Sequence, residues 1–420
     1  MSGSKKSMFS KGPGMHEKVT QTVRQTSLSI VQNDIQAVRR KNITKTGCRV
    51  IEGGKIGVAG GLGQVNCEEL FARAQKGLAY GVDYDVALTE NLTHSTRLDS
   101  MRISDSELCS RISLILKEIK SRHADFAVSN KVNLSHVSIS LENDRQLQLE
   151  HVDSYINLSL LLKKQGSTGI MDTFFGLVDR ELEEEKVINA VSEVISAYNN
   201  LQPMPAASTP LIINQQTLTR LFQRDLNARM VGNKASLFQQ QIGQKVFSDN
   251  FSLVIARDPV ETFGPAFDME GTITPESLRW LVKDGVIIRP YSDKKTAARY
   301  GFENTGCADG SYDSVPSLGG ANIEIPHAGK SLAELLNGQP GLMVQIASGG
   351  DFTPDGHYAS PVQVAFLTDG HKLLGRVPEF TIKGSIFDFF GHDFIGVSSD
   401  KIFVTGNDRM LVTRMATAKL

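Results

Sequence analysis

A proline-rich interruption near the middle of the chain constrains the fold more than any other sequence feature. The segment NLQPMPAASTP (200–210) contains three prolines and no apolar periodicity, and helix and strand patterns lie on both sides of it. Such a stretch is typical of a linker, because proline can neither continue a helix nor donate to a sheet ladder. A chain of 420 residues is also too long for one compact core. We therefore predict an N-terminal domain over 18–199, a linker over 200–210 and a C-terminal domain over 211–420.

The N-terminal part shows strand patterns first and helix patterns afterwards. Residues 1–17 are rich in Ser, Lys and Gly, and we predict a mobile tail there. The runs SLSIVQ, IQAVRR, CRVIE and KIGVAG are separated by Asn33-Asp34, by Lys45-Thr46-Gly47 and by Gly53-Gly54. Residues of these types supply the positive φ angles of tight hairpin turns, so the pattern predicts an antiparallel meander. Apolar residues at helical spacing predict helices over about 66–81, 106–120 and 181–198.

The C-terminal part is predicted to be mainly β. One helical region is expected over about 215–244, interrupted near Gly232. LVKDGVII and VAFLTDGHKLLG each contain two short apolar runs around an Asp-Gly pair, the pattern of a β-hairpin. A short helix is expected to begin at Ser331, with Glu334 in the capping-box position. The fold class is therefore α+β, with an N-terminal antiparallel sheet carrying helices and a mainly β C-terminal domain.

Composition narrows the classes of function. Lys and Arg number 45 against 46 for Asp and Glu, and this balance argues against DNA as the main ligand. The four cysteines form no C-x-x-C pair, which favours reduced thiols in the cytosol over a disulfide framework. The N-terminus has lysines without a following apolar region, and no run approaches 18 apolar residues. We expect a soluble cytoplasmic protein with no membrane contact.

Two candidate loops for phosphate binding or covalent catalysis have simpler structural explanations. The glycine-rich stretch 57–63 lacks the lysine of a phosphate loop, and Asn66 stands where the third glycine of a dinucleotide fingerprint belongs. A strand followed by a loop explains it equally well. Cys307 lies among small residues, but a catalytic thiol needs a histidine partner, and nothing pairs His327 or His357 with it. A packed or surface cysteine is favoured.

Histidines and carboxylates offer two further candidates. No histidine pair has the spacing of a helical metal motif, although His357, His371 and His392 could converge beside Asp351, Asp355 or Asp393. An exposed position next to the Asp-Gly turn is the simpler explanation for His371. Asp268 and Glu270 in FDMEGT would share one face of a strand. They could perform acid/base chemistry, bind a cation, or brace the Gly271-Thr272 turn through hydrogen bonds to backbone N–H groups.

The order of several motifs resembles one known family. AFDMEGTITPESLRWLVKDGVIIRPYSDKKTAARYGFENTGCA is similar to a segment of the TldD/PmbA family, often called modulator of DNA gyrase, in which an F-D-x-E-G turn precedes a hairpin, an A-R helix and a T-G loop. GDFTPDGHYASPVQVAFLTDGHKLLG and the sequence up to VSSD resemble the closing run of the family. CRVIEGGKIGVAGGLG resembles its opening unit. The resemblance spans about residues 32–401.

The resemblance implies a division of labour between two chains. TldD-like chains carry H-E-x-x-x-H on a helix at the start of the C-terminal domain and act as zinc metalloproteases, whereas TldE/PmbA-like chains lack this motif. The corresponding stretch here, LTRLFQRDLNARMVGNKASLFQQQIGQK, contains no histidine, and no cysteine follows Cys307. The resemblance therefore implies a non-catalytic subunit with no metal and no catalytic residues of its own. It departs from the family in its polar N-terminal tail and its short C-terminus.

The expected partners follow from the same resemblance. A TldD-like subunit would supply the zinc, and the pair would trim or mature small unfolded peptides; a homodimer is possible for the isolated chain. The residues implied to contact peptide are Asp268, Glu270, Gly271, Asn304, Thr305 and Gly306. Two alternatives stay open. One is a stand-alone hydrolase that uses Asp268, Glu270 and the C-terminal histidines, and the other is a regulatory protein that binds gyrase or another toxin target.

Overall fold

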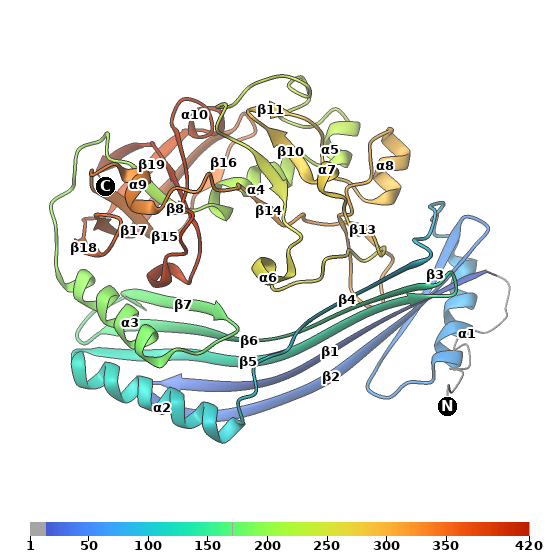
Figure 1. Cartoon of the computed structure of the whole chain (residues 1–420), viewed down its shortest axis with the longest axis horizontal. Coiled ribbons are helices and arrows are strands. Elements are labelled where there is room, and N and C mark those ends of the chain that lie inside the picture. Colours follow the sequence, from blue (N-terminus) through green and yellow to red (C-terminus); the bar gives the residue numbers. More distant parts are fainter. Residues whose placement is uncertain (1–13, 170, 420) are drawn as a thin grey trace.

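In a computed structural model, which describes residues 14–169 and 171–419, the chain folds into an α+β structure with 22% helix and 41% strand. A long sheet formed by the N-terminal half lies beneath a second, more irregular body formed by the C-terminal half (Figure 1). This architecture confirms the predicted fold class. The boundaries predicted for the two domains and the linker remain predictions.

The elements of the N-terminal half alternate between long strands and three main helices. They are β1 (Met15–Val31), β2 (Asp34–Glu52), β3 (Lys55–Leu62), α1 (Cys67–Gly77), η1 (Leu78–Tyr80), β4 (Leu92–Leu98), α2 (Asp105–Arg122), β5 (Phe126–Asn143), β6 (Leu147–Lys164), β7 (Thr173–Asp179) and α3 (Glu184–Asn199).

The elements of the C-terminal half are shorter. They are β8 (Leu211–Asn214), α4 (Gln216–Asp225), α5 (Ala228–Gly232), β9 (Leu253–Ile255), α6 (Pro259–Thr262), α7 (Glu276–Arg279), β10 (Trp280–Lys283), β11 (Val286–Ile287), α8 (Lys294–Tyr300), β12 (Ala308–Asp309), β13 (Ser317–Leu318), β14 (Ile323–Glu324), α9 (Leu332–Leu336), β15 (Gly341–Ala347), β16 (Asp351–Phe352), β17 (His357–Thr368), β18 (Leu373–Arg376), β19 (Phe380–Ser385), α10 (Ile386–Phe389), β20 (Phe394–Val397), η2 (Phe403–Thr405), β21 (Met410–Thr413) and β22 (Ala416–Lys419).

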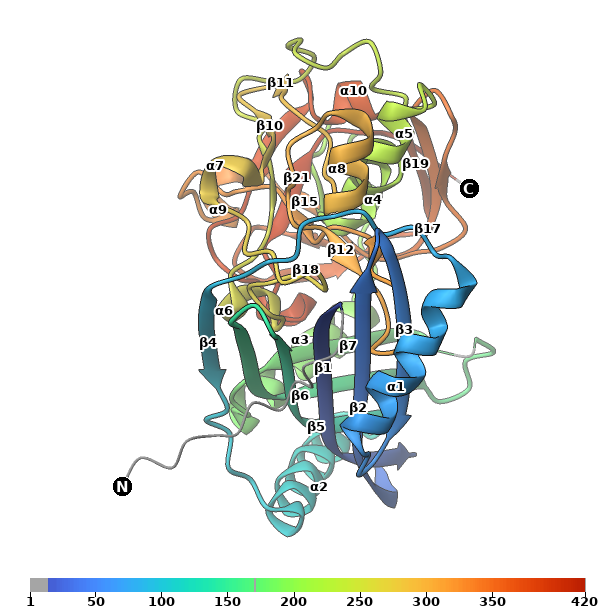
Figure 2. The same cartoon turned by 90° about the vertical axis from the view of Figure 1, so that its right-hand side faces the viewer.

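Four of the seven strands of the N-terminal sheet, β1, β2, β5 and β6, have 17 to 19 residues. Figure 2 views this sheet from the right-hand side of Figure 1. Its order is β3-β2-β1-β5-β6-β4, and β7 pairs with β6 beyond the end of β4. All pairs are antiparallel except β4 with β6. Apolar side chains of alternate residues gather on one face, where α2 and α3 pack against them. Successive residues of a strand point to opposite faces, and on the other face a second apolar cluster, formed by Val19, Leu141, Leu147 and Leu149, packs against Phe267 and Met269 of the C-terminal half.

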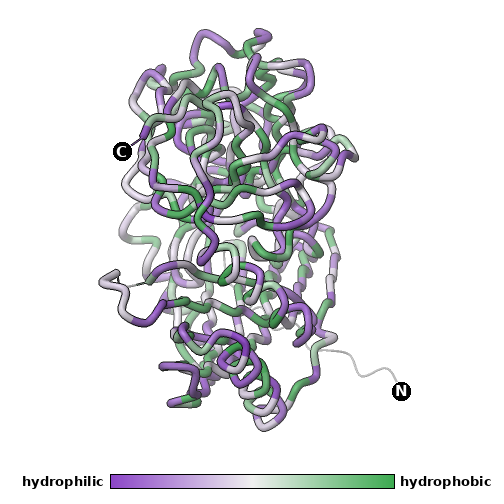
Figure 3. Tube along the Cα trace, turned by 90° about the vertical axis from the view of Figure 1, so that its left-hand side faces the viewer, coloured by the Kyte–Doolittle hydropathy of each residue, from purple (hydrophilic) through white to green (hydrophobic). Residues whose placement is uncertain are grey.

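Two sheets dominate the C-terminal half. A nine-stranded sheet has the order β20-β21-β8-β15-β17-β19-β22, with β16 and β18 each paired to β17 as well. A four-stranded sheet has the order β11-β10-β9-β14. Phenylalanines fill the core between them, and the rings of Phe251 and Phe390 are stacked with centroids 4.4 Å apart. Figure 3 shows hydrophilic outer loops around this more hydrophobic interior. No helix within the described ranges is long and apolar enough to cross a membrane.

A single apolar core runs across the junction of the two halves. It joins α2, α3 and the apolar sheet face to Ile212, Met343, Phe366 and Val412 of the C-terminal half. The segment 200–210 contains neither helix nor strand, and Leu201 forms a β-bridge with Arg376. The two halves therefore bury part of their apolar surface against each other.

Several local predictions are confirmed. Gln32 and Asn33 have positive φ in the β1–β2 turn, as do Gly53 and Gly54 in the β2–β3 turn. The 57–63 stretch forms most of strand β3 and the first residue of the loop after it. Ser331 and Glu334 form the expected capping box of α9. The two Asp-Gly hairpins appear as β10–β11 and β17–β18.

Three local predictions are wrong. Residues 15–17, predicted as part of a tail, instead pair with β2 and begin β1; residues 1–13 lie outside the described residues. The turn predicted at Lys45-Thr46-Gly47 lies inside the continuous strand β2. Gly47 is required there for close packing, because a Cβ would lie 1.6 Å from the carbonyl oxygen of Tyr312. The helical region predicted over 215–244 ends at Gly232, and turns follow it.

Candidate functional site

The FDMEGT segment forms a tight buried turn at the junction of the two halves. Asp268 Oδ1 accepts hydrogen bonds from the backbone N–H groups of Glu270 (2.9 Å) and Thr272 (2.8 Å). Asp268 Oδ2 accepts a third bond from the N–H of Ala308, 3.0 Å away. The Asp268 side chain thus closes the turn through two hydrogen bonds and connects it to the loop 304–308 through a third. The prediction that Asp268 and Glu270 share a strand face is wrong, because both lie in this turn.

Glu270 connects the turn to the N-terminal half. Its Oε1 accepts a hydrogen bond from the hydroxyl of Tyr84 (2.8 Å), and its Oε2 accepts one from the N–H of Lys294 (2.9 Å). Burial, and secondarily the charge of Asp268, raise the pKa of Glu270 to about 7. Burial likewise lowers the pKa of Lys294, whose Nζ donates to Thr89 Oγ1 at 2.8 Å.

A buried ion pair of the long sheet supports the turn from the other side. Arg49 Nη1 donates to Glu17 Oε1 and to the carbonyl oxygen of Met269, both at 2.8 Å. The Arg49 side chain is 0% exposed, so the guanidinium and its carboxylate partner are removed from water together. The turn is therefore held by charged groups from both halves of the chain.

The loop predicted to contact peptide lies directly against this turn. Asn304 Nδ2 approaches Thr272 Oγ1 at 3.4 Å, and Thr274 Oγ1 donates to the carbonyl of Thr305 at 2.8 Å. Gly306 has φ of +67° and packs against the side chains of Thr272 and Thr274. Thr305 and Gly306 are buried, whereas Asn304 is half-buried.

The structure brings the six predicted residues together, but it leaves little of them exposed. The carboxylates of Asp268 and Glu270 are 4% and 2% exposed as residues, and every oxygen already accepts a hydrogen bond. This is the turn-bracing arrangement that sequence reasoning weighed as the alternative to acid/base work. Direct peptide contact by the set stays a prediction, and Asn304 is its most accessible member.

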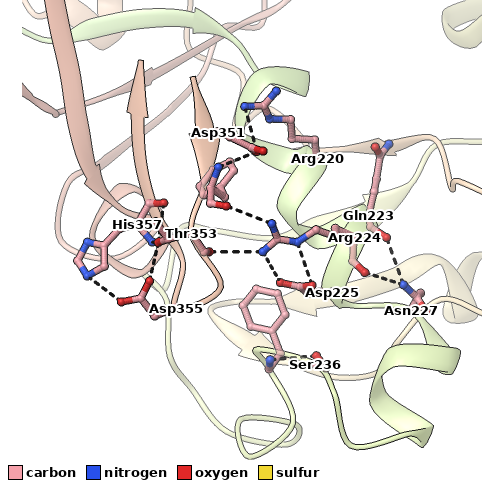
Figure 4. A network of polar contacts seen from close by, with 12 residues as sticks. Arg220, Gln223, Arg224, Asp225, Asn227, Ser236, Asp351, Thr353, Asp355 and His357 are labelled. Atoms are coloured by element: carbon pink, nitrogen blue, oxygen red, sulfur yellow. Dashed lines mark hydrogen bonds and ion pairs between the residues drawn. The ribbon is translucent and has the colours of Figure 1, made fainter. Parts of the chain in front are cut away.

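Helix α4 occupies the stretch in which the resemblance places the metal helix of catalytic relatives. Arg224 points between Asp225 and the 351–353 segment (Figure 4). Its Nη2 donates to Asp225 Oδ2 at 3.0 Å and its Nη1 to the carbonyl of Phe352 at 3.2 Å. Arg220 Nη2 donates to the carbonyl of Gly350 at 2.8 Å. Two guanidinium groups thus tie this helix to the β16 segment.

This donor set does not fit a zinc ion. Catalytic zinc requires three neutral or anionic protein ligands, usually His, Asp, Glu or Cys. Helix α4 instead presents two permanent cations, and a divalent ion there would meet their repulsion. Among residues 14–169 and 171–419, no group of three His, Cys, Asp or Glu side chains is arranged to hold a metal ion.

The remaining sequence candidates are dispersed. His357 lies 3.7 Å from Asp355, His392 lies near Asp388 and Asp393, and the backbone N–H of His371 donates to Asp369. Within the described chain these residues form no group of three placed to hold a metal ion. Cys307 is buried, and burial raises the pKa of its thiol. Its polar neighbours are Arg257 and Thr305, with no histidine among the contacts of the described residues.

A cleft of about 1030 Å³ lies between strands β6 and β7 of the long sheet and the C-terminal half. Its walls include β7 and β14, and each is the last strand of its sheet within the described chain. Glu261 accepts hydrogen bonds from Arg409 and Lys401, both at 2.9 Å. Burial raises the pKa of Glu324 and of Asp408 in the same wall. The cleft therefore combines free strand edges with charged side chains of both signs.

These features define an α+β protein with a cleft between its two halves, a buried carboxylate turn at their junction and, among the described residues, no group of three side chains placed to hold a metal ion. Residues 207–418 match the family profile described as "PmbA/TldA metallopeptidase C-terminal domain". The chain belongs to the TldD/PmbA family. No curated protein matches the sequence.

Solved structures share the fold over almost the whole chain. TldE from Thermococcus kodakarensis is 19% identical with a TM-score of 0.78, and the match covers 97% of each chain. A protein described as a modulator of a DNA gyrase from Thermotoga maritima is 18% identical with a TM-score of 0.76 and 96% of each chain covered. A similarly described protein from Bacteroides thetaiotaomicron is 15% identical, with a TM-score of 0.77 over 97% of this chain and 95% of the other.

Sequence reasoning missed the residues that the N-terminal half brings to the turn. Glu17, Arg49 and Tyr84 lie 180 or more positions away from Glu270. Glu17 and Tyr84 belong to no recognisable motif, and Arg49, although part of CRVIEGGKIGVAGGLG, was not predicted to contact the turn. Glu17 was assigned to the tail. The one available signal was Arg49 inside an apolar strand pattern, because a buried arginine requires a partner.

Proposed function

We propose that this chain is a non-catalytic subunit that works with a TldD-like zinc protease in the maturation or degradation of small unfolded peptides. The observation that carries the proposal is the chemistry of α4, where Arg220 and Arg224 stand in the stretch that the resemblance assigns to the metal motif. The partner subunit would supply the zinc and the hydrolysis. A cytoplasmic location is part of the same proposal.

The cleft supports the peptide part of the proposal. An extended peptide can add to the free edge of β7 or β14, and the main-chain hydrogen bonds of such an addition depend little on side-chain identity. The turn at Asp268–Gly271 and the loop at Asn304–Gly306 would shape the neighbouring junction, with Asn304 offering a polar group. Folded substrates would not enter, because strand addition needs an unpaired backbone.

The test compares this chain alone, a TldD-like chain alone, and the two after co-purification from one cell. We expect peptide cleavage to need the TldD-like chain and to stop with a chelator. Gly176→Phe should fill the cleft and weaken peptide binding by the pair, because a Cβ at Gly176 meets nothing closer than 3.9 Å. Leu114→Phe, on the exposed side of α2, is the matched control.

Three outcomes would overturn the proposal. Chelator-sensitive cleavage by this chain alone, with bound zinc at one ion per chain, would indicate a stand-alone hydrolase. Capture of gyrase without any TldD-like chain would favour a regulatory protein, although the balanced net charge of −1 argues against direct DNA contact. A stable homodimer that excludes the TldD-like chain would remove the proposed complex.

A further inference from the structure

The outer edge of strand β2 is unpaired over much of its length. β2 pairs with β1 from end to end, but β3 pairs with β2 only from Lys45 to Glu52. The last contact is the hydrogen bond from the N–H of Gly63 to the carbonyl of Thr44, at 2.8 Å. From residue 34 to residue 43 no strand of the described chain lies on this side, and β2 forms the lower margin of the sheet in Figure 1.

The free edge offers a regular row of backbone groups. Residues two apart in a strand direct their N–H and C=O groups to the same side. Val38, Arg40 and Asn42 therefore point their backbone groups outward in the same direction as Thr44. This is the geometry to which a further strand can add.

The same edge carries a block of positive charge. Arg39, Arg40 and Lys41 are consecutive and exposed, so their side chains lie on both faces of the strand. Arg40 is bound to Asp105, at the start of α2. Arg39 and Lys41 have no ion-pair or hydrogen-bond partner among the described residues. An added strand would thus meet cationic side chains above and below its plane.

A cavity of about 670 Å³ beside the edge extends this positive surface. Its lining includes the side chains of Arg24, Arg40, Lys41, Arg102 and His136. The one carboxylate in the lining is that of Asp105, which Arg40 already binds. Burial, and secondarily the charges of Arg24 and Arg102, lower the pKa of His136, as expected in a positive field. This excess of cations contrasts with the net charge of −1 for the whole chain.

A second copy of the chain is a poor occupant of this edge. Antiparallel pairing of two β2 edges about a two-fold axis centred on the basic block would set Arg39 against Lys41 of the other copy. Like charges directly opposite each other destabilise a strand pair. A strand that carries carboxylates would instead place opposite charges at the same positions.

We propose that the β2 edge, residues 34–43, is a docking site for an extended acidic segment of a partner polypeptide, which adds to the sheet as a strand. The outward N–H and C=O groups of β2 fix the register of the added strand. The positive charges of residues 39–41 favour carboxylates on both of its faces. This site is separate from α4 and from the cleft between the two halves. The proposal does not depend on the proposed protease complex. A contrary explanation is that the charges only protect the edge from aggregation.

The probe is the acetylated, amidated peptide TVEEEVT, with TVKKKVT as its charge-reversed control. Binding to the full chain is measured by fluorescence anisotropy at low and at physiological ionic strength. We expect the acidic peptide to bind at least tenfold more tightly than the basic one, with weakening by salt. The double variant Arg39→Glu/Lys41→Glu should reverse the preference. It alters only exposed side chains, and circular dichroism would verify its fold.

Two further measurements separate strand addition from simple charge attraction. Val38→Pro removes an outward N–H but keeps every charge, and proline is tolerated on a strand edge; we expect it to weaken binding of the acidic peptide at least fivefold. An N-methylated acidic peptide should bind as weakly. Equal binding of both peptides, binding of neither, insensitivity to Val38→Pro, or a dimer of the chain that Val38→Pro dissociates would overturn the proposal.

Discussion

Two clusters of charged residues in this protein use similar side chains for different purposes. At the junction of the two halves, Arg49 and Glu17 form a pair that is 0% and 3% exposed at the side chains. On α4, the side chains of Arg220 and Arg224 are 42% and 43% exposed. The first cluster fixes the turn of Glu270 between the halves, and the second lies on the surface where water and other molecules can reach it.

The contrast shows that burial decides what a charged residue can do. A buried charge loses its hydration, so its partner must replace water, and breaking such a pair is costly. An exposed pair gains little, because water screens it and the side chains lose freedom. The junction carboxylates are therefore poor candidates for chemistry despite their raised pKa values. On α4, Arg220 can be varied with little cost to the fold, whereas Arg224 also donates to the buried Asp225.

Substitution of Arg49 should give the largest effect of this comparison. Arg49→Met leaves the Glu17 carboxylate buried without its ion-pair partner, and we expect a loss of about 3–5 kcal/mol in the free energy of unfolding. Denaturant titration measures the loss. The double variant Arg49→Met/Glu17→Gln, which removes both charges, should recover at least half of it. If the double variant is as unstable as the single one, the ion pair is not the source of the effect.

Gly271 tests how tightly the turn is seated against the sheet. It has φ of +71°, and a Cβ there would lie 2.8 Å from Leu147 Cδ2 and 3.2 Å from Leu141 Cδ2. We expect Gly271→Ala to cost about 2–4 kcal/mol, from backbone strain and overpacking together. Gly53→Ala is the control, because Gly53 has φ of +58° but nothing within 4 Å of a Cβ. It should cost only about 1 kcal/mol, and equal losses in thermal unfolding would contradict tight seating.

Glu270 should make the stability of the junction depend on pH. Its pKa is raised from 4.5 to about 7, so the folded protein retains a proton that the unfolded chain has already released. This contribution is complete below about pH 4.5 and is lost as the pH rises to 7, with a total of about 3 kcal/mol. Glu270→Gln should remove that slope from the unfolding free energy measured between pH 4.5 and 7.5. Asp268, whose pKa is also raised, contributes a slope of the same sign that the variant retains. An unchanged profile in the variant would show that Glu270 titrates normally.

The sequence predicted the elements that depend on neighbouring residues. It did not predict the contacts between residues that are far apart in the chain. The Asp-Gly hairpins and the Ser331 capping box depend on neighbouring residues, and the structure confirms them. Gly47 appeared to mark a turn, yet its small size is needed by Tyr312, which lies more than 260 positions later. The six predicted site residues lie together in the structure. They were predicted from two motifs of the family resemblance, and these two segments pack against each other. Their burial could not be predicted, because it depends on the N-terminal sheet that covers them.

The smallest expected effects distinguish the two arginines of α4 from each other. Arg220 binds the carbonyl of Gly350 and lies 3.8 Å from the exposed Asp351, so Arg220→Ala should change the unfolding free energy by less than about 1 kcal/mol. Arg224 donates two hydrogen bonds to Asp225, which is 4% exposed and has no other side-chain partner among the described residues. Arg224→Ala should therefore cost more, about 1–3 kcal/mol, because a buried carboxylate loses its donors.

Parallel denaturant titrations of the two α4 variants would resolve this difference, and Arg224→Ala/Asp225→Asn should restore part of the loss. Equal and negligible losses of unfolding free energy would mean that water replaces Arg224 as the donor to Asp225. Both arginines of α4 would then contribute equally little to stability. A larger loss for Arg224→Ala would show that Arg224 stabilises the fold and that Arg220 does not. The two arginines are four residues apart, so the difference would arise within about one turn of the helix.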